Sequence, residues 1–184
     1  MSDSSTTLVP KRIFIEPAER EQMGKRITSW MIEKGWIEAE ISDCVFSEGG
    51  GHRITREGNT HISGCEPDHD LAVNGFCVEQ FNGKNVFTNL EGGLESAVCP
   101  GCGEDIGEEF YDMTGEWFAG EGNPPIPCPC CGESFDIRKY VLEPTWGFSQ
   151  IGFVFWNLSD MTEEFVAEFA AVLGEPVQVV WAHL

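Results

Sequence analysis

The clearest apolar pattern lies near the C-terminal end of the chain and predicts a strand, a helix and a second strand. Residues 152–156 are continuously apolar, as in a buried strand. Asp160 and Glu163 form a carboxylate variant of the capping box, and Gly174 ends the helix that begins there. Residues 177–181 predict the last strand. One apolar stripe runs along the helix through Met161, Phe165, Val166, Phe169, Ala170, Val172 and Leu173.

A similar pattern occupies the N-terminal part. Residues 11–16 predict a short strand, and Pro17 opens a helix at a position where its missing N–H is harmless. Gly35 provides a stop, and residues 36–46 alternate well enough to predict a second strand. The apolar residues of this helix recur at helical spacing and are Met23, Ile27, Trp30 and Met31.

Two strand–helix–strand units predict an α+β fold. Packed together, they would form a ferredoxin-like sandwich. Between them, residues 47–70 are Gly-rich and are expected to be irregular, whereas residues 71–90 predict a strand or a hairpin that turns at Asn82-Gly83. We therefore expect an α/β core over residues 11–96 and 142–184, with residues 97–141 inserted into it.

Residues 1–10 are polar and rich in Ser and Thr, so we expect a disordered tail there. They have neither the basic start nor the apolar run of a signal peptide. No stretch approaches the ~18 apolar residues that a membrane span needs. Together with eight cysteines, these features favour the reducing cytoplasm.

The predicted insert carries two matched cysteine hooks of the form Cys-Pro-x-Cys-Gly. Cys99 and Cys102 belong to the first, and Cys128 and Cys131 belong to the second. A two-residue spacer lets both sulfurs of a hook face one ion, and the Gly after each hook permits the positive φ that turns the chain away. The segments that follow the two hooks are also similar, Gly-Glu-Asp-Ile after the first and Gly-Glu-Ser-Phe-Asp-Ile after the second, which indicates a short internal duplication.

Over residues 97–141 the chain resembles the zinc-ribbon proteins. Four thiolates in two hooks close a tetrahedral shell around Zn²⁺, so the predicted site is structural, with no open position for a substrate. An iron centre, redox-active cysteine pairs and disulfides are the alternatives. Cys130 is the spacer residue of the second hook and is not expected to be a ligand.

Charge is distributed very unevenly. The chain carries 11 basic and 31 acidic side chains, a net charge of −20. Residues 57–184 account for −19 of it and contain three cations. A surface that binds phosphates needs clustered Lys and Arg, so this composition argues against direct nucleic-acid binding. The acidic excess serves either solubility or attraction of a basic protein partner.

Other residues with candidate chemistry lie in the Gly-rich segment. His52, His61, Cys65 and His69 could form a second metal site or a thiol-dependent active site, but Gly58, Gly64 and Pro67 argue against a helix that would align them. Cys44 and Cys77 adjoin apolar residues and are expected to be buried, inert thiols.

Three aromatic residues, Tyr111, Trp117 and Phe118, lie within the acidic stretch 104–121. They either anchor a protein partner or cover the small core of the insert. Our leading hypothesis is a non-catalytic, zinc-braced acidic protein that binds a basic protein, in an antidote-like or regulatory role. The alternatives are a zinc- or thiol-dependent enzyme that uses the His52, His61, Cys65 and His69 region, and a regulator that mimics nucleic acid.

Overall fold

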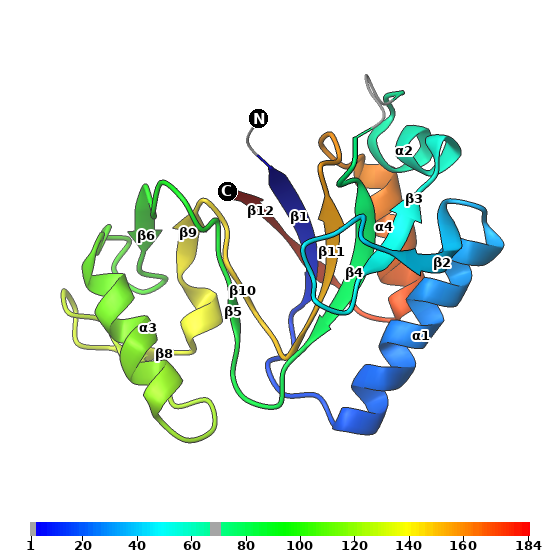
Figure 1. Cartoon of the computed structure of the whole chain (residues 1–184). Coiled ribbons are helices and arrows are strands. Elements are labelled where there is room, and N and C mark those ends of the chain that lie inside the picture. Colours follow the sequence, from blue (N-terminus) through cyan, green and yellow to red (C-terminus); the bar gives the residue numbers. More distant parts are fainter. Residues whose placement is uncertain (1–2, 67–70) are drawn as a thin grey trace.

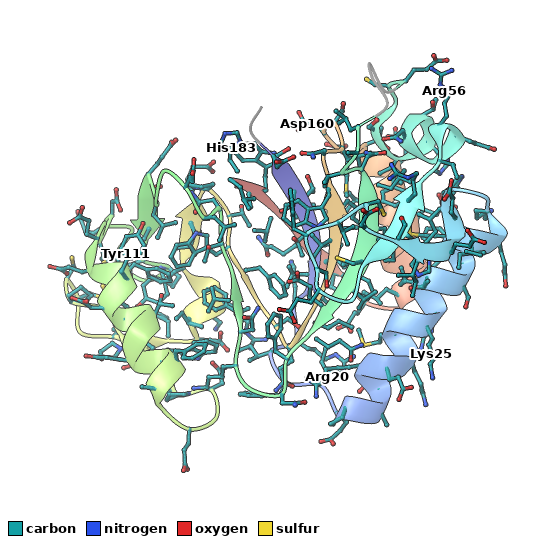
Figure 2. All side chains as sticks on the ribbon, viewed as in Figure 1. Arg20, Lys25, Arg56, Tyr111, Asp160 and His183 are labelled. Atoms are coloured by element: carbon teal, nitrogen blue, oxygen red, sulfur yellow. The ribbon has the colours of Figure 1, made fainter. Side chains whose placement is uncertain are left out.

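A computed structural model describes residues 3–66 and 71–184 and shows two lobes (Figure 1). Side chains fill both lobes (Figure 2). In chain order the elements are β1 (Ser4–Pro10), α1 (Pro17–Glu33), β2 (Ile37–Ser42), β3 (Gly51–Ile54), α2 (Arg56–Ser63), β4 (Gly75–Gln80), β5 (Val86–Phe87), β6 (Ser96–Val98), α3 (Glu109–Ala119), β7 (Ile126–Pro127), β8 (Ser134–Phe135), η1 (Ile137–Lys139), β9 (Val141–Glu143), β10 (Gly147–Phe148), β11 (Ile151–Trp156), α4 (Glu163–Leu173) and β12 (Val177–His183).

The larger lobe is built on a six-stranded sheet in the order β12-β1-β11-β4-β3-β2, in which all neighbours are antiparallel. The α+β class is thus confirmed. The predicted C-terminal unit is present as β11–α4–β12, which straddles β1. An N-terminal unit is also present as β1–α1–β2, but its first strand is Ser4–Pro10 and not the predicted residues 11–16. β3 and β4 lie between β11 and β2, so the sheet is wider than the two units alone would make it. We call this part, with α1, α2 and α4, the sheet lobe.

Two helices cover one face of the sheet and form its main core. Met23, Ile27 and Met31 of α1 are buried, and α4 buries Phe165, Phe169 and Leu173 in the same cluster. From the sheet, Phe153 and Phe155 point to these helices, since side chains alternate along β11. Burying a side chain of this size contributes about 1.5–3 kcal/mol. This stripe pattern was predicted from the sequence, as were Pro17 at the first turn of α1 and Gly35 in the left-handed region after it.

The expectation of a disordered tail over residues 1–10 is wrong for the residues that the structure describes. Ser4–Pro10 is β1, which lies inside the sheet and pairs with β11 on one side and β12 on the other. The prediction relied on the polar side chains of this segment. A strand that is paired on both sides is held by backbone hydrogen bonds, which form whatever the polarity of its side chains. Residues 11–16, expected to be a strand, form none. They lead into α1 with Ile13 and Ile15 buried.

The segment 47–70 is also more regular than expected, since it contains β3 and α2. Gly58 does not break α2. It lets the helix approach the backbone of Trp36, and a Cβ at this position would collide with the Trp36 carbonyl oxygen. Gly64 ends the helix in the left-handed conformation that glycine favours. Here glycine permits close packing of a helix, and the residues around it remain helical.

Two local predictions need correction. Residues 71–90 form no hairpin, because β4 joins the large sheet whereas β5 pairs with β10. Turn chemistry at Asn82-Gly83 specifies a reversal but not which strand the chain pairs with next. The cap of α4 is Thr162, whose hydroxyl accepts a hydrogen bond from the Phe165 N–H at 3.2 Å, rather than Asp160.

The smaller lobe runs from β5 to β10 and carries both cysteine hooks, so we call it the hook lobe (Figure 1). It contains three two-stranded sheets, β5–β10, β6–β9 and β7–β8, and one helix, α3. Its core includes Phe110, Met113 and Trp117 from α3, and Ile13 from the N-terminal segment also enters it. The lobe therefore packs directly against the chain that leads into α1.

None of the helices in residues 3–66 and 71–184 is long and apolar enough to cross a membrane.

Candidate metal centre

The four predicted ligands meet at one point in the hook lobe. The sulfurs of Cys99, Cys102, Cys128 and Cys131 all lie within 4.8 Å of one another, and those of Cys102 and Cys128 are 4.0 Å apart. A tetrahedron of sulfurs at about 2.3 Å from a central ion has edges of roughly 3.8 Å. The cluster is therefore of the right size to hold a metal ion with only a slight contraction.

The two hooks repeat each other in their hydrogen bonds. The Cys99 N–H donates to the Glu104 carbonyl at 2.9 Å, and the Cys128 N–H donates to the Glu133 carbonyl at 2.8 Å. Each hook closes when the N–H of its glycine donates to the carbonyl of its first cysteine. The two glycines, Gly103 and Gly132, have φ values of 74° and 75°. The duplication seen in the sequence is thus a duplication of geometry.

Backbone amides face the first sulfur of each hook. The Gly101 N–H donates to Cys99 Sγ and the Cys130 N–H to Cys128 Sγ, both at 3.4 Å. Burial by itself would raise the pKa of Cys128, but N–H groups of Cys131 and Cys130 offset it, and the pKa falls to about 7. Such donors stabilise the thiolate, which is the form that binds metal.

The donor set indicates which ions fit. Cys99 and Cys128 are each 1% exposed and belong to the core of the lobe, whereas Cys102 and Cys131 face solvent. Four thiolates suit Zn²⁺ or an iron centre and do not suit Mg²⁺ or Ca²⁺, which prefer oxygen ligands. Since all four positions of a tetrahedral ion would be protein sulfurs, a metal bound here would have no open position for a substrate.

Tyr140 packs beside the four cysteines. It is buried and donates its hydroxyl to the Ile126 carbonyl at 3.3 Å. Burial first, and then the nearby negative charge of Cys128 and Cys99, raise the pKa of Tyr140 to about 12. The hydroxyl therefore stays neutral and keeps this hydrogen bond at ordinary pH.

A relay of hydrogen bonds ties α3 to the N-terminal segment, and the sequence analysis missed it. Trp117 Nε1 donates to Asn123 at 2.8 Å, and Asn123 donates to Asp136 at 2.7 Å. Arg138 donates hydrogen bonds to Asp136 from two side-chain nitrogens and donates a third to the Lys11 carbonyl at 2.7 Å. The sequence did offer one indication of a structural role for Arg138, because it is one of three cations in residues 57–184.

A second of these rare cations, Lys84, also has a structural role. Its ammonium lies 4.6 Å from the centre of the Trp117 ring and donates to the carbonyls of Trp117 and Gly120 at the C-terminal end of α3. Burial lowers the pKa of Lys84. A cation at a helix C-terminus is favourable because the last carbonyls have no helical partner.

The aromatic residues of the acidic stretch divide between the two roles proposed for them. Trp117 is fully buried and packs edge-on against Phe148, so it belongs to the core and does not anchor a partner. Tyr111 and Phe118 are 40% and 53% exposed on the outer side of α3. The Tyr111 hydroxyl already accepts a hydrogen bond from the Leu94 N–H at 2.6 Å, so Phe118 is the ring with more freedom to contact another molecule.

The histidine-rich region is not assembled into a site in the described part of the chain. Among those residues, the hook cysteines are the one group of three or more His, Cys, Asp or Glu side chains close enough to share an ion. His52 bonds to the Glu38 carbonyl at 2.8 Å. His61 stacks on Trp36 at 3.9 Å between ring centres and pairs with Glu168 at 3.0 Å. Cys65 is exposed, and His69 lies outside the described residues.

The remaining cysteines match expectation in their burial. Cys44 and Cys77 are buried on the face of the sheet opposite α1 and α4, together with Val154 and Trp156. Burial is the main reason that the pKa of Cys77 rises to about 12, so its thiol is not ionised at neutral pH. Cys130 is exposed on its hook.

Comparison of the chain with protein-family models, with curated proteins and with solved structures finds no match. We therefore infer its function from the residues and geometry of this chain alone.

Proposed function

We propose that the hooks bind one structural Zn²⁺ and that the braced hook lobe presents an acidic surface to a basic protein partner. The metal assignment is supported by four converging sulfurs in two geometrically matched hooks, in the manner of a zinc ribbon. Bound zinc would hold the two hooks together and so fix the segments that flank α3. Under this proposal the metal acts on folding and takes no part in a reaction.

The observation that carries the binding role is the outer side of α3. Glu109, Asp112 and Glu116 are exposed on it, together with Tyr111 and Phe118, while the opposite side of the helix is buried in the lobe. A cluster of one charge sign steers an oppositely charged partner and raises the association rate, and exposed aromatic rings supply anchors that slow dissociation. A merely solubilising surface needs the charges but gains nothing from exposed rings.

An antidote-like protein that neutralises a basic toxin or nuclease is one concrete form of this function. The charge of −19 over residues 57–184 supports this form. Eight cysteines suit a reducing compartment, so we also propose the cytoplasm as the site of action. We also propose that the sheet lobe is an elaborated ferredoxin-like sandwich; the support is that β11–α4–β12 straddles β1, as in a split β-α-β unit.

The function can be tested by affinity capture with charge variants of the purified, metal-loaded chain. One variant combines Glu109→Gln, Asp112→Asn and Glu116→Gln. The matched control neutralises Glu33, Glu38 and Glu40, which are exposed at the end of α1 and on the edge strand β2 of the other lobe. A captured protein should be basic and stoichiometric, retained by wild type and control, and released by the α3 variant.

Association kinetics with that purified partner then test the mechanism. The association rate should fall steeply as salt rises, and the α3 charge variant should associate about tenfold more slowly at low salt. Phe118→Ala should mainly speed dissociation. A partner whose binding ignores both salt and the α3 variant would contradict the proposal, as would turnover of a small molecule that is lost in His61→Ala.

A further inference from the structure

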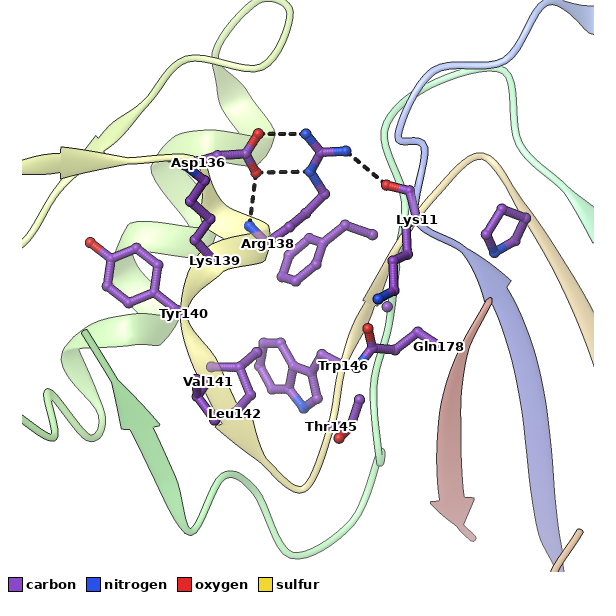
Figure 3. A pocket seen from close by; sticks show the side chains of 13 residues that line it. Lys11, Asp136, Arg138, Lys139, Tyr140, Val141, Leu142, Thr145, Trp146 and Gln178 are labelled. Atoms are coloured by element: carbon purple, nitrogen blue, oxygen red, sulfur yellow. Dashed lines mark hydrogen bonds and ion pairs between the residues drawn. The ribbon is translucent and has the colours of Figure 1, made fainter. Parts of the chain in front are cut away.

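A cavity of about 470 Å³ lies between the two lobes, where the end of β1 and β12 face η1, β9 and β10 (Figure 3). Its volume is within the range of sites for small organic molecules. Trp146, Phe148 and Leu142 form an apolar floor, and each is almost fully buried with one edge facing the cavity. Gln178 and Thr145 add polar groups at the side.

The charge of this cavity is opposite to that of the chain. Lys11, Arg138 and Lys139 line it together with a single carboxylate, Asp136, which leaves a local charge of +2 in a chain of −20. Two of the three cations in residues 57–184 are thus placed here. Arg138 and Lys139 are consecutive in the sequence, whereas Lys11 reaches the same hollow from the N-terminal segment.

The cations of the cavity differ in how they are already used. Arg138 is held by Asp136 and by the Lys11 carbonyl, and so it fixes one wall. Lys11 and Lys139 are exposed, and neither takes part in any of the five ion pairs found among the described residues. Figure 3 shows Lys11 extending toward Gln178 and Trp146, whereas Lys139, on the opposite wall above Tyr140, extends toward Asp136. The ammonium group of Lys11 therefore faces the cavity, and Lys139 adds positive charge at its rim.

We propose that this cavity binds a small organic anion, whose aromatic or other flat apolar body lies against the exposed edge of Trp146 while its phosphate or carboxylate meets the ammonium group of Lys11. The floor supplies apolar contact area, Lys11 supplies charge-assisted hydrogen bonds, and Lys139 adds positive charge at the rim. This site is separate from the hooks and from the outer side of α3, so its existence does not depend on the proposed protein partner.

The probe for this site is 1-naphthyl phosphate, titrated calorimetrically at low ionic strength into the metal-loaded chain. We expect one site, with Lys11→Gln weakening the affinity by about tenfold, as for loss of a hydrogen bond to a charged group, and Lys139→Gln weakening it by less. Lys25→Gln is the matched control, since it removes the same charge from an exposed residue on α1 that pairs with Glu21, and it should leave the affinity unchanged.

Three further ligands define the chemistry. 1-Naphthoate should compete more weakly than the phosphate, because it carries less charge. If naphthoate competes equally well or better, the site still binds anions, and carboxylates are its natural class. The 1-naphthylmethylammonium cation should not bind. Equal competition by inorganic phosphate would overturn the role of the apolar floor. Absence of binding, or equal affinity in the Lys11→Gln, Lys139→Gln and Lys25→Gln variants, would overturn the proposal.

Discussion

The two lobes of this protein differ in the length of their strands and in the side chains that form their cores. In the sheet lobe, strands of up to seven residues and two helices enclose a core of large apolar side chains. In the hook lobe, the strands have two or three residues each, and two of the core positions are the thiols Cys99 and Cys128. The hook lobe also has an apolar core around Trp117, but its short strand ladders and core thiols lead us to expect that a cross-link adds to its stability.

A metal ion would supply that cross-link. In small metal-binding domains the free energy of metal binding is largely free energy of folding, on the order of 10 kcal/mol for four suitable ligands. We expect no such dependence in the sheet lobe, because none of the hook cysteines belongs to its core. Under the proposed metal assignment, one chain combines a lobe stabilised by burial with a lobe stabilised by a ligand, and variants of each lobe test this difference.

The largest expected effect is loss of the metal from the hooks. Cys128→Ser should abolish stoichiometric zinc binding, since an uncharged hydroxyl cannot replace a buried thiolate. Metal content per chain, measured by elemental and native mass spectrometry, checks this. Cys130→Ser is the matched control on the same hook and should retain one ion. A chain that contains no metal as isolated and takes up none, with eight titratable thiols, would contradict the metal assignment.

A smaller but still large effect is expected from the core of the sheet lobe. Phe169→Ala removes a fully buried ring that packs against Phe153 and should cost about 3–5 kcal/mol of the free energy of unfolding. Urea unfolding of the metal-loaded chain measures it. Phe118→Ala, which removes an exposed ring from the hook lobe, should change that free energy by about 0.5 kcal/mol or less. Similar losses for both would mean that Phe118 packs in the folded state.

The smallest effect concerns the contact between the lobes at Asp136. Hydrogen bonds from Arg138, above all, hold the pKa of Asp136 down to about 2. Because the folded pKa lies below the unfolded value of about 4, the pair stabilises the fold fully above pH 4 and loses this contribution as pH falls towards 2.

Asp136→Asn should therefore cost about 1 kcal/mol at pH 7, after allowance for the solvent exposure of Arg138. The difference between wild type and variant should shrink between pH 4 and pH 2. A difference that stays constant over that interval would show that the carboxylate charge is not what matters.

Features encoded in local spacing were predictable from the sequence. The hooks, the stripe of α4 and the ends of α1 each depend on residues a few positions apart. Features that depend on distant pairing were not. β1 looked like a polar tail because its place between β11 and β12 depends on strands more than 140 residues away in sequence.

The same reason explains the other misses. Gly58 argued against a helix until the approach of α2 to Trp36 was known, and the partner of β5 could not be read from a turn at Asn82-Gly83. Trp117 illustrates the limit for the functional surface. Its place in an acidic stretch left open whether the ring is exposed or buried, and the helix turns it into the core and leaves Phe118 outside.

The most direct test of the difference between the lobes is amide hydrogen exchange of the metal-loaded chain before and after removal of the ion by a chelator. We predict that protection is lost over residues 97–141 while the amides of β1, β4 and β11 keep theirs, because only the hook lobe depends on the cross-link. Loss of protection throughout the chain in one cooperative step, or unchanged protection in the hooks, would contradict this difference.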